Sequence, residues 1–375
     1  MTKFRLLLSS TFIFLLACGA DNSLLAQNNP FTVTEVADFD QPWAMTFMPD
    51  GRLLVSEKQG ALKVYDLDSG AMGEVSGVPD VRSAGQGGFA DIVLHPEFSS
   101  NSMVYMSFTE SGRGGSGAAV ARASLTLNGN DGELQNLEVI WRQFPKVSGN
   151  GHFSQRIAFH DGYLWISSGD RQKFDPAQDM EMNLGKIMRL NYDGSVPSDN
   201  PFVDQGGVAA QVWSLGHRNP LGLAFDANGQ PWNVEMGPAG GDEINRVVRG
   251  GNYGYPIVSN GDHYSGERIP DHSTRQEFNT PAAFWTPVIS PSSLMFYSGS
   301  EFPAWQGNAF IGGLSSESLV RIEFNGVQAN EAQRFDMNQR IREVEQGPDG
   351  AIYVLEDQRQ MRGSGGRLLK LTARD

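Results

Sequence analysis

The stretch IAFHDGYLWI, residues 157–166, consists of an apolar run, a tight turn at Asp161-Gly162 and a second apolar run. Asp-Gly and Asn-Gly pairs suit the two-residue turns of β-hairpins, because such turns need a positive φ. The stretch therefore predicts a hairpin. The pattern recurs as AMTFMPDGRLLV (44–55), IVLHPEFSSNSMVYM (92–106), LAFDANGQPW (223–232), LMFYSGSEFPAWQGNAFIG (294–312) and VEQGPDGAIYV (344–354).

Hairpins repeated at a regular period predict an all-β fold, a six-bladed β-propeller. The chain has 44 Gly and 19 Pro and few segments with a helical period, which agrees with this fold class. Six units give roughly 57 residues each, which exceeds the usual blade, so the surplus is expected in loops after the third and fourth units. A propeller gathers such loops on one face around its channel, where ligands bind.

The N-terminus has the pattern of a secretory signal. Two positive charges precede a short apolar run, residues 6–17, which is too brief for a membrane-spanning helix. The sequence LLAC, residues 15–18, resembles the lipobox of bacterial lipoproteins. We therefore expect a lipoprotein-type signal peptide at 1–17, a lipid anchor at Cys18, a tether at 18–32 and the propeller domain at 33–375. The protein is then exported and periplasmic; cleavage near Ala26, which would release a soluble periplasmic protein, is the alternative.

Charge and cysteine content restrict the partners. The net charge of −14 argues against nucleic acid and against an anionic membrane surface. Cys18 is the only cysteine, so the chain has no internal disulfide and no Cys-based metal site.

The segment 213–266 has the composition of a binding site. It is rich in Gly, Pro and Asn, which let the backbone approach a ligand closely and leave carbonyl groups free for a cation. A long structural loop is the alternative. Donors and hard oxygen ligands concentrate in this segment, at Arg218, Asn219, Asp242, Glu243, Asn245 and Tyr253.

His152 is the candidate general base. It lies in a Gly-rich connection before a predicted strand, and imidazole titrates near working pH, although a lone His is more often structural. Gln86 stands in a similar Gly-rich entry. Arg340 and Arg342 flank Ile341 in a predicted strand and so point to one face, as a carboxylate trap or as a solvated edge. Asp170 follows a strand and contacts substrate or caps a turn.

Together these fragments resemble the soluble pyrroloquinoline quinone (PQQ)-dependent aldose sugar dehydrogenases of the glucose/sorbosone dehydrogenase family, which fold as six-bladed propellers. The resemblance runs from about Gln41 to Leu371. Its motifs are Gly85-Gln86-Gly87-Gly88, Gly151-His152 with Arg156, Arg218-Asn219-Pro220, Gly237-Pro238 with Gly241-Asp242-Glu243-Ile244-Asn245, Asn252-Tyr253-Gly254, Tyr264-Ser265-Gly266 and Arg340-Ile341-Arg342.

The resemblance implies a role for each matched residue. His152 would take the proton of the sugar's anomeric hydroxyl, and Arg218 would stabilise charge on the reduced quinone. PQQ would contact Gln86, Asn219, Tyr264, Arg340 and Arg342, and Gln86 would also position the aldose, with Asp170 as a further substrate contact. Calcium would bind the carbonyls of Gly237 and Pro238, and a second calcium would bind Glu243 and the carbonyl of Tyr253. An external acceptor would take the electrons.

One position departs from the family. Better-known members carry a Lys that contacts the quinone where this chain has Ser315, and a hydroxyl cannot supply an ammonium's charge. Two other classes therefore remain as alternatives: a calcium-dependent propeller lactonase, which the Arg340 and Arg342 pair disfavours, and a carbohydrate-binding propeller without catalysis.

Overall fold

The computed structural model describes residues 29–357 and 366–374 of the chain. The predicted signal peptide and the lipid-anchor position Cys18 lie outside these residues. Strand β1 begins at Phe31 and pairs with the C-terminal strand, so Phe31 and Thr32, at the end of the predicted tether, are part of a sheet. No helix among the described residues is long and apolar enough to cross a membrane.

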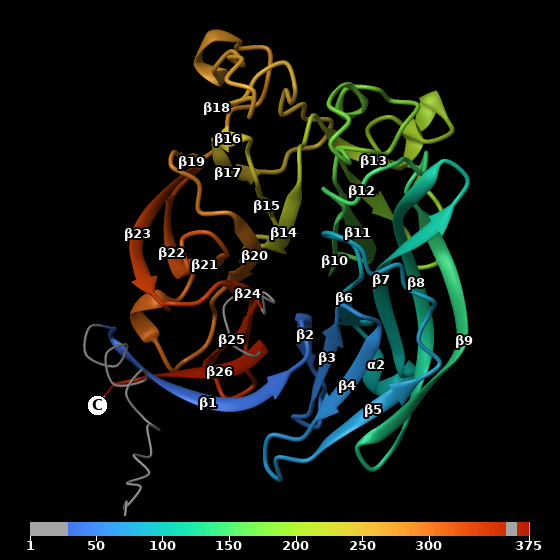
Figure 1. The fold of residues 1–375 in the computed structure, drawn as a ribbon, viewed down its shortest axis with the longest axis vertical. Coiled ribbons are helices and arrows are strands. Elements are labelled where there is room, and N and C mark those ends of the chain that lie inside the picture. Colours follow the sequence, from blue (N-terminus) through green and yellow to red (C-terminus); the bar gives the residue numbers. More distant parts are fainter. Residues whose placement is uncertain (1–28, 358–365, 375) are drawn as a thin grey trace, which may run out of the picture.

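The fold is all-β, as predicted, and its sheets are arranged around a centre (Figure 1). An eight-stranded sheet contains two sets of four strands that a short parallel pairing of β5 and β9 joins. Its strands are β2 (Pro42–Phe47), β3 (Leu53–Glu57), β4 (Ala61–Tyr65), β5 (Met72–Ser76), β6 (Phe89–Leu94), β7 (Met103–Gly112), β8 (Gly115–Asn128) and β9 (Asp131–Arg142).

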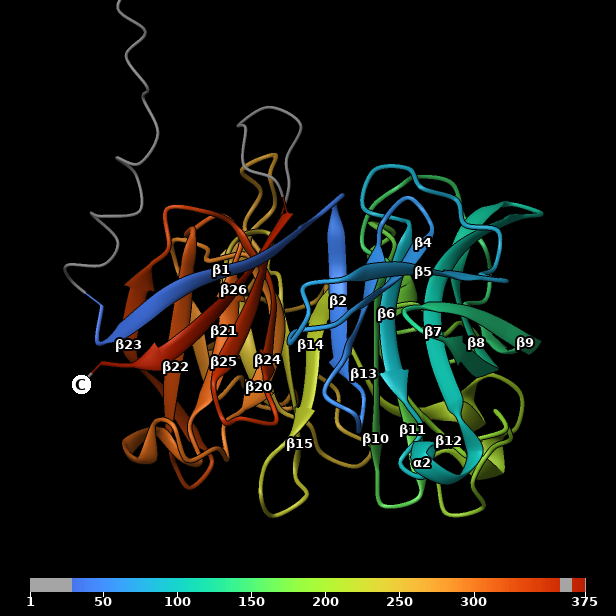
Figure 2. The same cartoon turned by 90° about the horizontal axis from the view of Figure 1, so that it is seen from below.

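Four further sheets hold four antiparallel strands each. They are β10 (Ser154–His160), β11 (Tyr163–Ser168), β12 (Lys186–Leu190) and β13 (Val212–Leu215); β14 (Pro220–Phe225), β15 (Pro231–Glu235), β17 (Asp242–Arg246) and β19 (Ala283–Trp285); β20 (Pro291–Phe296), β21 (Ala309–Gly313), β22 (Ser318–Asn325) and β23 (Gln328–Asp336); and β24 (Ile341–Gln346), β25 (Ile352–Glu356), β26 (Gly366–Ala373) and β1 (Phe31–Phe39). The last sheet joins both ends of the described chain (Figure 2).

Helices are few and short among the described residues. The α-helix α2 (Phe98–Asn101) connects β6 to β7. The 3₁₀ turns are η1 (Asp175–Ala177), η2 (Val203–Gln205), η3 (Ala209–Gln211), η4 (His272–Thr274) and η5 (Pro303–Trp305), and β16 (Ala239–Gly240) pairs with β18 (Gly261–Asp262).

Each predicted hairpin is present as an antiparallel pair. In the stretch 157–166, His160 of β10 faces Tyr163 of β11, and the turn residues Asp161 and Gly162 both have positive φ, 48° and 81°. The predicted surplus of loop lies between β12 and β13 and between β17 and β19, where Figure 1 shows long excursions at one end of the molecule.

The first strands of the hairpins line the centre of the molecule. Strands β2, β6, β10, β14, β20 and β24 contact one another in a closed ring. Arg156 of β10 lies at its middle and is buried. Its guanidinium stacks on Trp43 of β2 and bonds to Asp91 of β6, the carbonyls of Leu221 of β14 and Ser292 of β20, and Glu343 of β24. Arg156, which belongs to the same sequence motif as His152, thus connects the strands of the ring.

Candidate active site

His152 lies in the connection from β9 to β10, and two side chains orient it. Its backbone N–H donates to Gln86 Oε1 at 2.7 Å, and its Nδ1 lies 2.6 Å from Asp170 Oδ1. An ionised carboxylate only accepts hydrogen bonds, so Nδ1 carries the proton and Nε2 is left as the basic nitrogen. Burial lowers the pKa of His152, and the hydrogen bond that Nδ1 donates to Asp170 opposes this shift only in part. The imidazole is therefore neutral near pH 7.

Asp170 lies behind the imidazole. Its side chain is fully buried, and it also accepts hydrogen bonds from the backbone N–H groups of Gln172 and Phe174. The carboxylate therefore caps a turn and holds His152. It does not lie on a surface that substrate reaches, which speaks against the predicted substrate contact.

Arg171 fixes the loop that carries His152. The buried guanidinium donates to the carbonyls of Ser116, Gly149 and Gly151 and lies 3.6 Å from the centre of the Phe153 ring. His152 itself has φ 50°, a conformation that a non-glycine residue keeps only where its surroundings enforce it. No motif in the sequence indicated these contacts of Arg171.

Arg218 joins the His152 group to a second cluster. Its carbonyl accepts a hydrogen bond from the N–H of Asp170, and its Nη1 donates to the carbonyls of Met236 and Gly237 at 2.9 and 2.6 Å. The guanidinium lies 5.8 Å from the ring centre of Tyr264, which is 78% exposed. Asn219 is buried next to it, and its Oδ1 accepts a hydrogen bond from Ser154.

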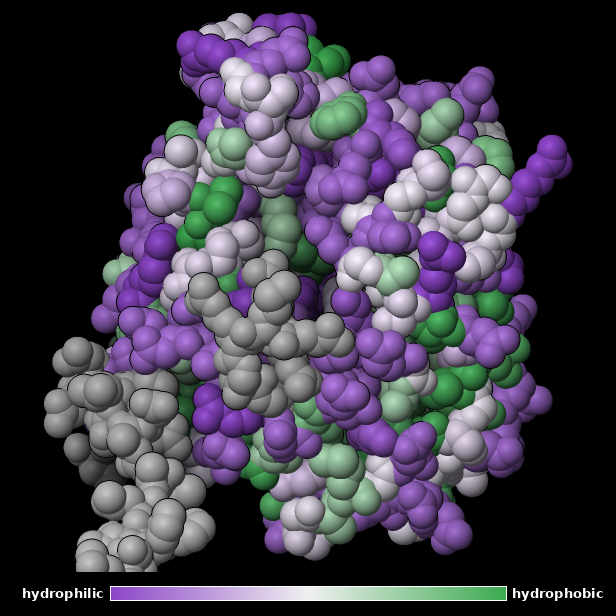
Figure 3. Space-filling view, viewed as in Figure 1, coloured by the Kyte–Doolittle hydropathy of each residue, from purple (hydrophilic) through white to green (hydrophobic). Residues whose placement is uncertain are grey.

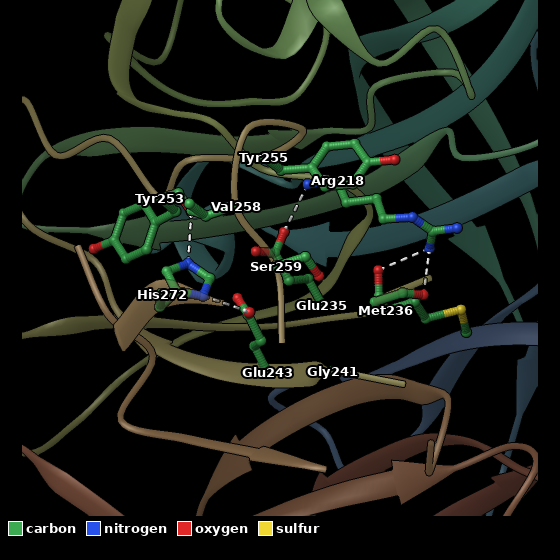
Figure 4. Close-up of a pocket in the computed structure, with 11 residues that line it drawn as sticks. Arg218, Glu235, Met236, Gly241, Glu243, Tyr253, Tyr255, Val258, Ser259 and His272 are labelled. Carbon is green, nitrogen blue, oxygen red and sulfur yellow. Dashed lines mark hydrogen bonds and ion pairs between the residues drawn. The ribbon is translucent and has the colours of Figure 1, made fainter. Parts of the chain in front are cut away.

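A small cavity adjoins Arg218 (Figure 4). Its free volume of about 10 Å³ is enough for roughly one water molecule or one cation. It is lined by Arg218, Glu235, Met236, Gly237, Gly241, Glu243, Tyr253, Tyr255, Val258, Ser259 and His272. Burial raises the pKa of Glu243 well above its usual range, and the charge of Glu235 raises it further.

Some polar atoms beside this cavity have no hydrogen-bond partner within the described part of the chain. His272 Nε2 donates to the carbonyl of Tyr253 at 3.0 Å, so the neutral ring turns the lone pair of Nδ1 toward Glu243 Oε1, 3.7 Å away. Two acceptors facing each other repel unless a proton or cation lies between them. His272 Nδ1 and Asn245 Oδ1 are both buried, and neither has a hydrogen-bond partner among the described residues. The oxygen atoms among them, those of Glu243 and Asn245, are of the kind that a hard cation prefers.

The predicted metal ligands divide accordingly. Gly237, Glu243 and Tyr253 line the cavity, whereas Pro238 does not, and the Pro238 carbonyl accepts a hydrogen bond from Gly240. In the described part of the chain, no three His, Cys, Asp or Glu side chains are grouped to hold a metal. A cation here would therefore depend on backbone carbonyls.

Arg340 and Arg342 both bind one carboxylate, that of Asp357, which the sequence did not suggest. Arg340 Nε donates to Asp357 Oδ2, and Arg342 donates through Nε and Nη2 to Asp357 Oδ1. Burial favours the neutral carboxyl, but the two guanidinium groups outweigh it and lower the pKa of Asp357. Arg340 also donates to the carbonyl of Leu314, next to the exposed Ser315, whose hydroxyl donates to Ser290. Figure 3 shows one face of the molecule, which is hollowed near its middle.

The sequence profile of the glucose / sorbosone dehydrogenase family matches residues 39–370. The chain belongs to this family. The resemblance drawn from the motifs is thus confirmed, as are the propeller class of fold and the class of enzyme, a sugar dehydrogenase.

Alignments with individual relatives cover most of the length of this glucose / sorbosone dehydrogenase family member. Aldose sugar dehydrogenase YliI of Escherichia coli (strain K12) is 37% identical over 346 residues, 90% of this chain and 91% of that protein. The crystal structure of the soluble aldose sugar dehydrogenase from Escherichia coli in the apo-form has a TM-score of 0.85 at 36% identity and covers 92% of this chain and 100% of that one. The PQQ-bound aldose sugar dehydrogenase from Streptomyces coelicolor has a TM-score of 0.76 at 29% identity, covering 92% and 98%.

Proposed function

We propose that this family member oxidises aldose sugars to lactones with PQQ as cofactor and calcium as metal ion, and passes the electrons to an external acceptor. The observation that carries the proposal is the His152 imidazole, buried and held by Asp170 with Nε2 as its basic nitrogen, next to Arg218. The PQQ-bound relative and the relatives named aldose sugar dehydrogenase support the choice of cofactor and substrate class.

His152 supplies the proton transfer. Nε2 accepts the proton of the anomeric hydroxyl as the C–H bond of the anomeric carbon breaks, and Asp170 stabilises the imidazolium that results. PQQ, when bound, supplies the acceptor for the hydride. Gln86 lies within 2.7 Å of the His152 backbone, so its amide is in position to orient the sugar.

The cations of the site would hold the cofactor. A planar tricarboxylate suits guanidinium forks, and Arg340 and Arg342 already share one carboxylate, Asp357, in this geometry. Arg218, Asn219 and Tyr264 would contact the quinone, and Arg218 would stabilise the negative charge of its reduced form. One calcium would be held by the carbonyls of Gly237 and Pro238. A second would be held by Glu243 and the carbonyl of Tyr253, where it would relieve the repulsion among the buried acceptors.

The architecture supports a six-bladed count. If the eight-stranded sheet is divided at the short parallel pairing of β5 and β9, every blade has four strands, and the closed ring has one first strand per blade.

We also propose that the chain is exported and lipid-anchored at Cys18. Growth with a labelled fatty acid tests this, since Cys18→Ala should lose the label.

The experiment adds PQQ and calcium to the purified apo-protein and follows reduction of an artificial electron acceptor with a panel of aldoses. Turnover that requires both additions supports the proposal. Quinone binding without turnover would favour a binding module, and absence of quinone binding would favour the lactonase.

A matched pair of variants tests the base. His152→Ala should retain PQQ binding and lose roughly 10²- to 10⁴-fold in turnover, the usual contribution of a positioned base. His160→Gln is the control, because His160 stacks on Phe225 away from the site. Unchanged turnover in His152→Ala would remove His152 from the mechanism.

A further inference from the structure

Lys58 lies beside the candidate site, although no motif in the sequence pointed to it. It directly follows β3, and its Nζ donates to the carbonyl of Gly85 at 2.6 Å, next to Gln86. Its own backbone N–H donates to the carbonyl of Gln41, directly before β2, and its carbonyl accepts a hydrogen bond from Phe89 at the start of β6. Lys58 is thus fixed where two of the ring strands begin.

The same backbone contacts bring Lys58 toward Arg342. Strand β2, to which Lys58 is bonded, contacts β24, which carries Arg342. Burial lowers the pKa of the Lys58 ammonium. The positive charge of Arg342 lowers this pKa further, and the negative charge of Asp357 opposes the shift. Lys58 therefore belongs to the electrostatic environment of the Arg340 and Arg342 pair.

Positive charges gather beside the candidate site. Lys58, Arg340 and Arg342 carry three positive charges, and Asp357 supplies one carboxylate to the two arginines. Among the described residues, Lys58 donates to a neutral carbonyl and forms no ion pair. A partly buried cluster of like charges is costly unless an anion joins it. Such a cluster suits a ligand with more than one carboxylate.

We propose that Lys58 binds a carboxylate of the polycarboxylate cofactor together with Arg340 and Arg342, and so supplies from the β3 side the ammonium that Ser315 lacks. The inference rests on the proposed function, since PQQ is its ligand. The Lys58 ammonium is bonded next to Gln86 and interacts with the charge of Arg342, so its charge reaches the region where cofactor and sugar would meet.

The test is a fluorescence titration of the purified full chain with PQQ at fixed calcium, at low and high salt. Lys58→Gln keeps an amide that can donate to Gly85 but removes the charge, and Lys58→Arg keeps the charge. Lys63→Gln is the matched control, because the Lys63 ammonium pairs with Glu74 on another strand. Thermal melts without cofactor check that each variant folds.

Lys58→Gln should weaken PQQ binding about ten-fold or more at low salt, as expected when a charged hydrogen bond is lost. The loss should shrink at high salt, where charges are screened. Lys58→Arg and Lys63→Gln should bind PQQ like the wild type. If the wild type binds PQQ and Lys58→Gln binds it equally well, Lys58 only anchors the Gln86 loop, and the inference falls while the proposed function stands. Absence of PQQ binding by the wild type would overturn both.

Discussion

At the scale of single residues, the candidate site depends on how buried polar groups are paired. His152 keeps a neutral imidazole because burial disfavours its charged form, and Asp170 fixes which nitrogen carries the proton. Arg171 and Gln86 hold the backbone of the same loop. The base is therefore oriented before any ligand arrives, which is how a positioned base gains its rate advantage.

Asp170→Asn tests this orientation through the pH profile. The carboxylate opposes the burial effect and keeps the pKa of His152 from falling further, so its removal should shift the acidic limb of kcat/KM to lower pH. The amide can also stabilise the wrong tautomer, so turnover should fall roughly 10²-fold or more, with unchanged PQQ affinity. An acidic limb that stays in place would show that His152 is not the group that titrates.

Glu243→Gln tests the calcium proposal. Burial and the charge of Glu235 make the Glu243 carboxylate costly in the apo-protein, and a bound cation would reverse this cost. In calorimetric titrations, Glu243→Gln should bind calcium about ten-fold more weakly or worse. Its melting temperature without calcium should equal or exceed that of the wild type, and added calcium should raise it less.

The control for Glu243→Gln is Glu267→Gln, because Glu267 lies in the exposed part of the neighbouring loop. A Glu243→Gln variant that binds calcium as tightly as the wild type would exclude Glu243 as a ligand.

At the scale of elements, the hairpins could be predicted from sequence because their turns are local. Asp161-Gly162 and Asn228-Gly229 fix a hairpin within ten residues or so. The parallel pairing of β5 and β9 could not be predicted, because the two strands are distant in the sequence and no turn signal connects them.

The residues of the candidate site divide in the same way, into those with a local sequence signal and those without one. His152, Arg218 and the Arg340 and Arg342 pair stand in distinctive local motifs, whereas Asp357 and Lys58 reach the site only through packing of β25 and β3.

The ring of first strands predicts a specific pH dependence. Burial and the charge of Glu343 raise the pKa of Glu345 on β24 to about 8, with Arg156 opposing the shift. At pH values between the pKa of Glu345 in the unfolded chain and about 8, the folded chain binds the Glu345 proton more tightly than the unfolded chain does. The stability of the fold should therefore fall as the pH rises through this range. Glu345→Gln imitates the neutral carboxyl and should lose less stability between about pH 5 and about pH 8.

Thermal melts across this pH range provide the measurement. At about pH 8, Glu345→Gln should melt a few degrees above the wild type, by roughly 2–4 °C per kcal/mol. Glu74→Gln changes an exposed carboxylate and should follow the wild-type profile. Parallel pH profiles for Glu345→Gln and the wild type would mean that Glu345 ionises in the folded protein as it does in the unfolded chain.

At the scale of the whole molecule, closure of the ring joins the two ends of the described chain. Strand β1 pairs with β26 from Phe31 opposite Ala373 to Phe39 opposite Gly366. This sheet contains β24, which carries Arg342, and β24 contacts both β2 and β20. Opening the closure would therefore loosen one wall of the candidate site as well as the fold.

Phe31→Ala tests how much this closure contributes. The ring is fully buried and packs edge-on against Trp305 and Phe335, with ring centres 6.4 and 5.1 Å away. Removing it should lower the free energy of unfolding by about 3–5 kcal/mol in denaturant titrations, because the cavity left behind adds to the lost burial. Thr34→Ala, on an exposed position of the same strand, should cost far less. PQQ affinity measured well below the melting temperature should remain near that of the wild type, since Phe31 lies in the apolar cluster of Trp305 and Phe335. Equal stability of the two variants would show that β1 docks on β26 without closing the fold.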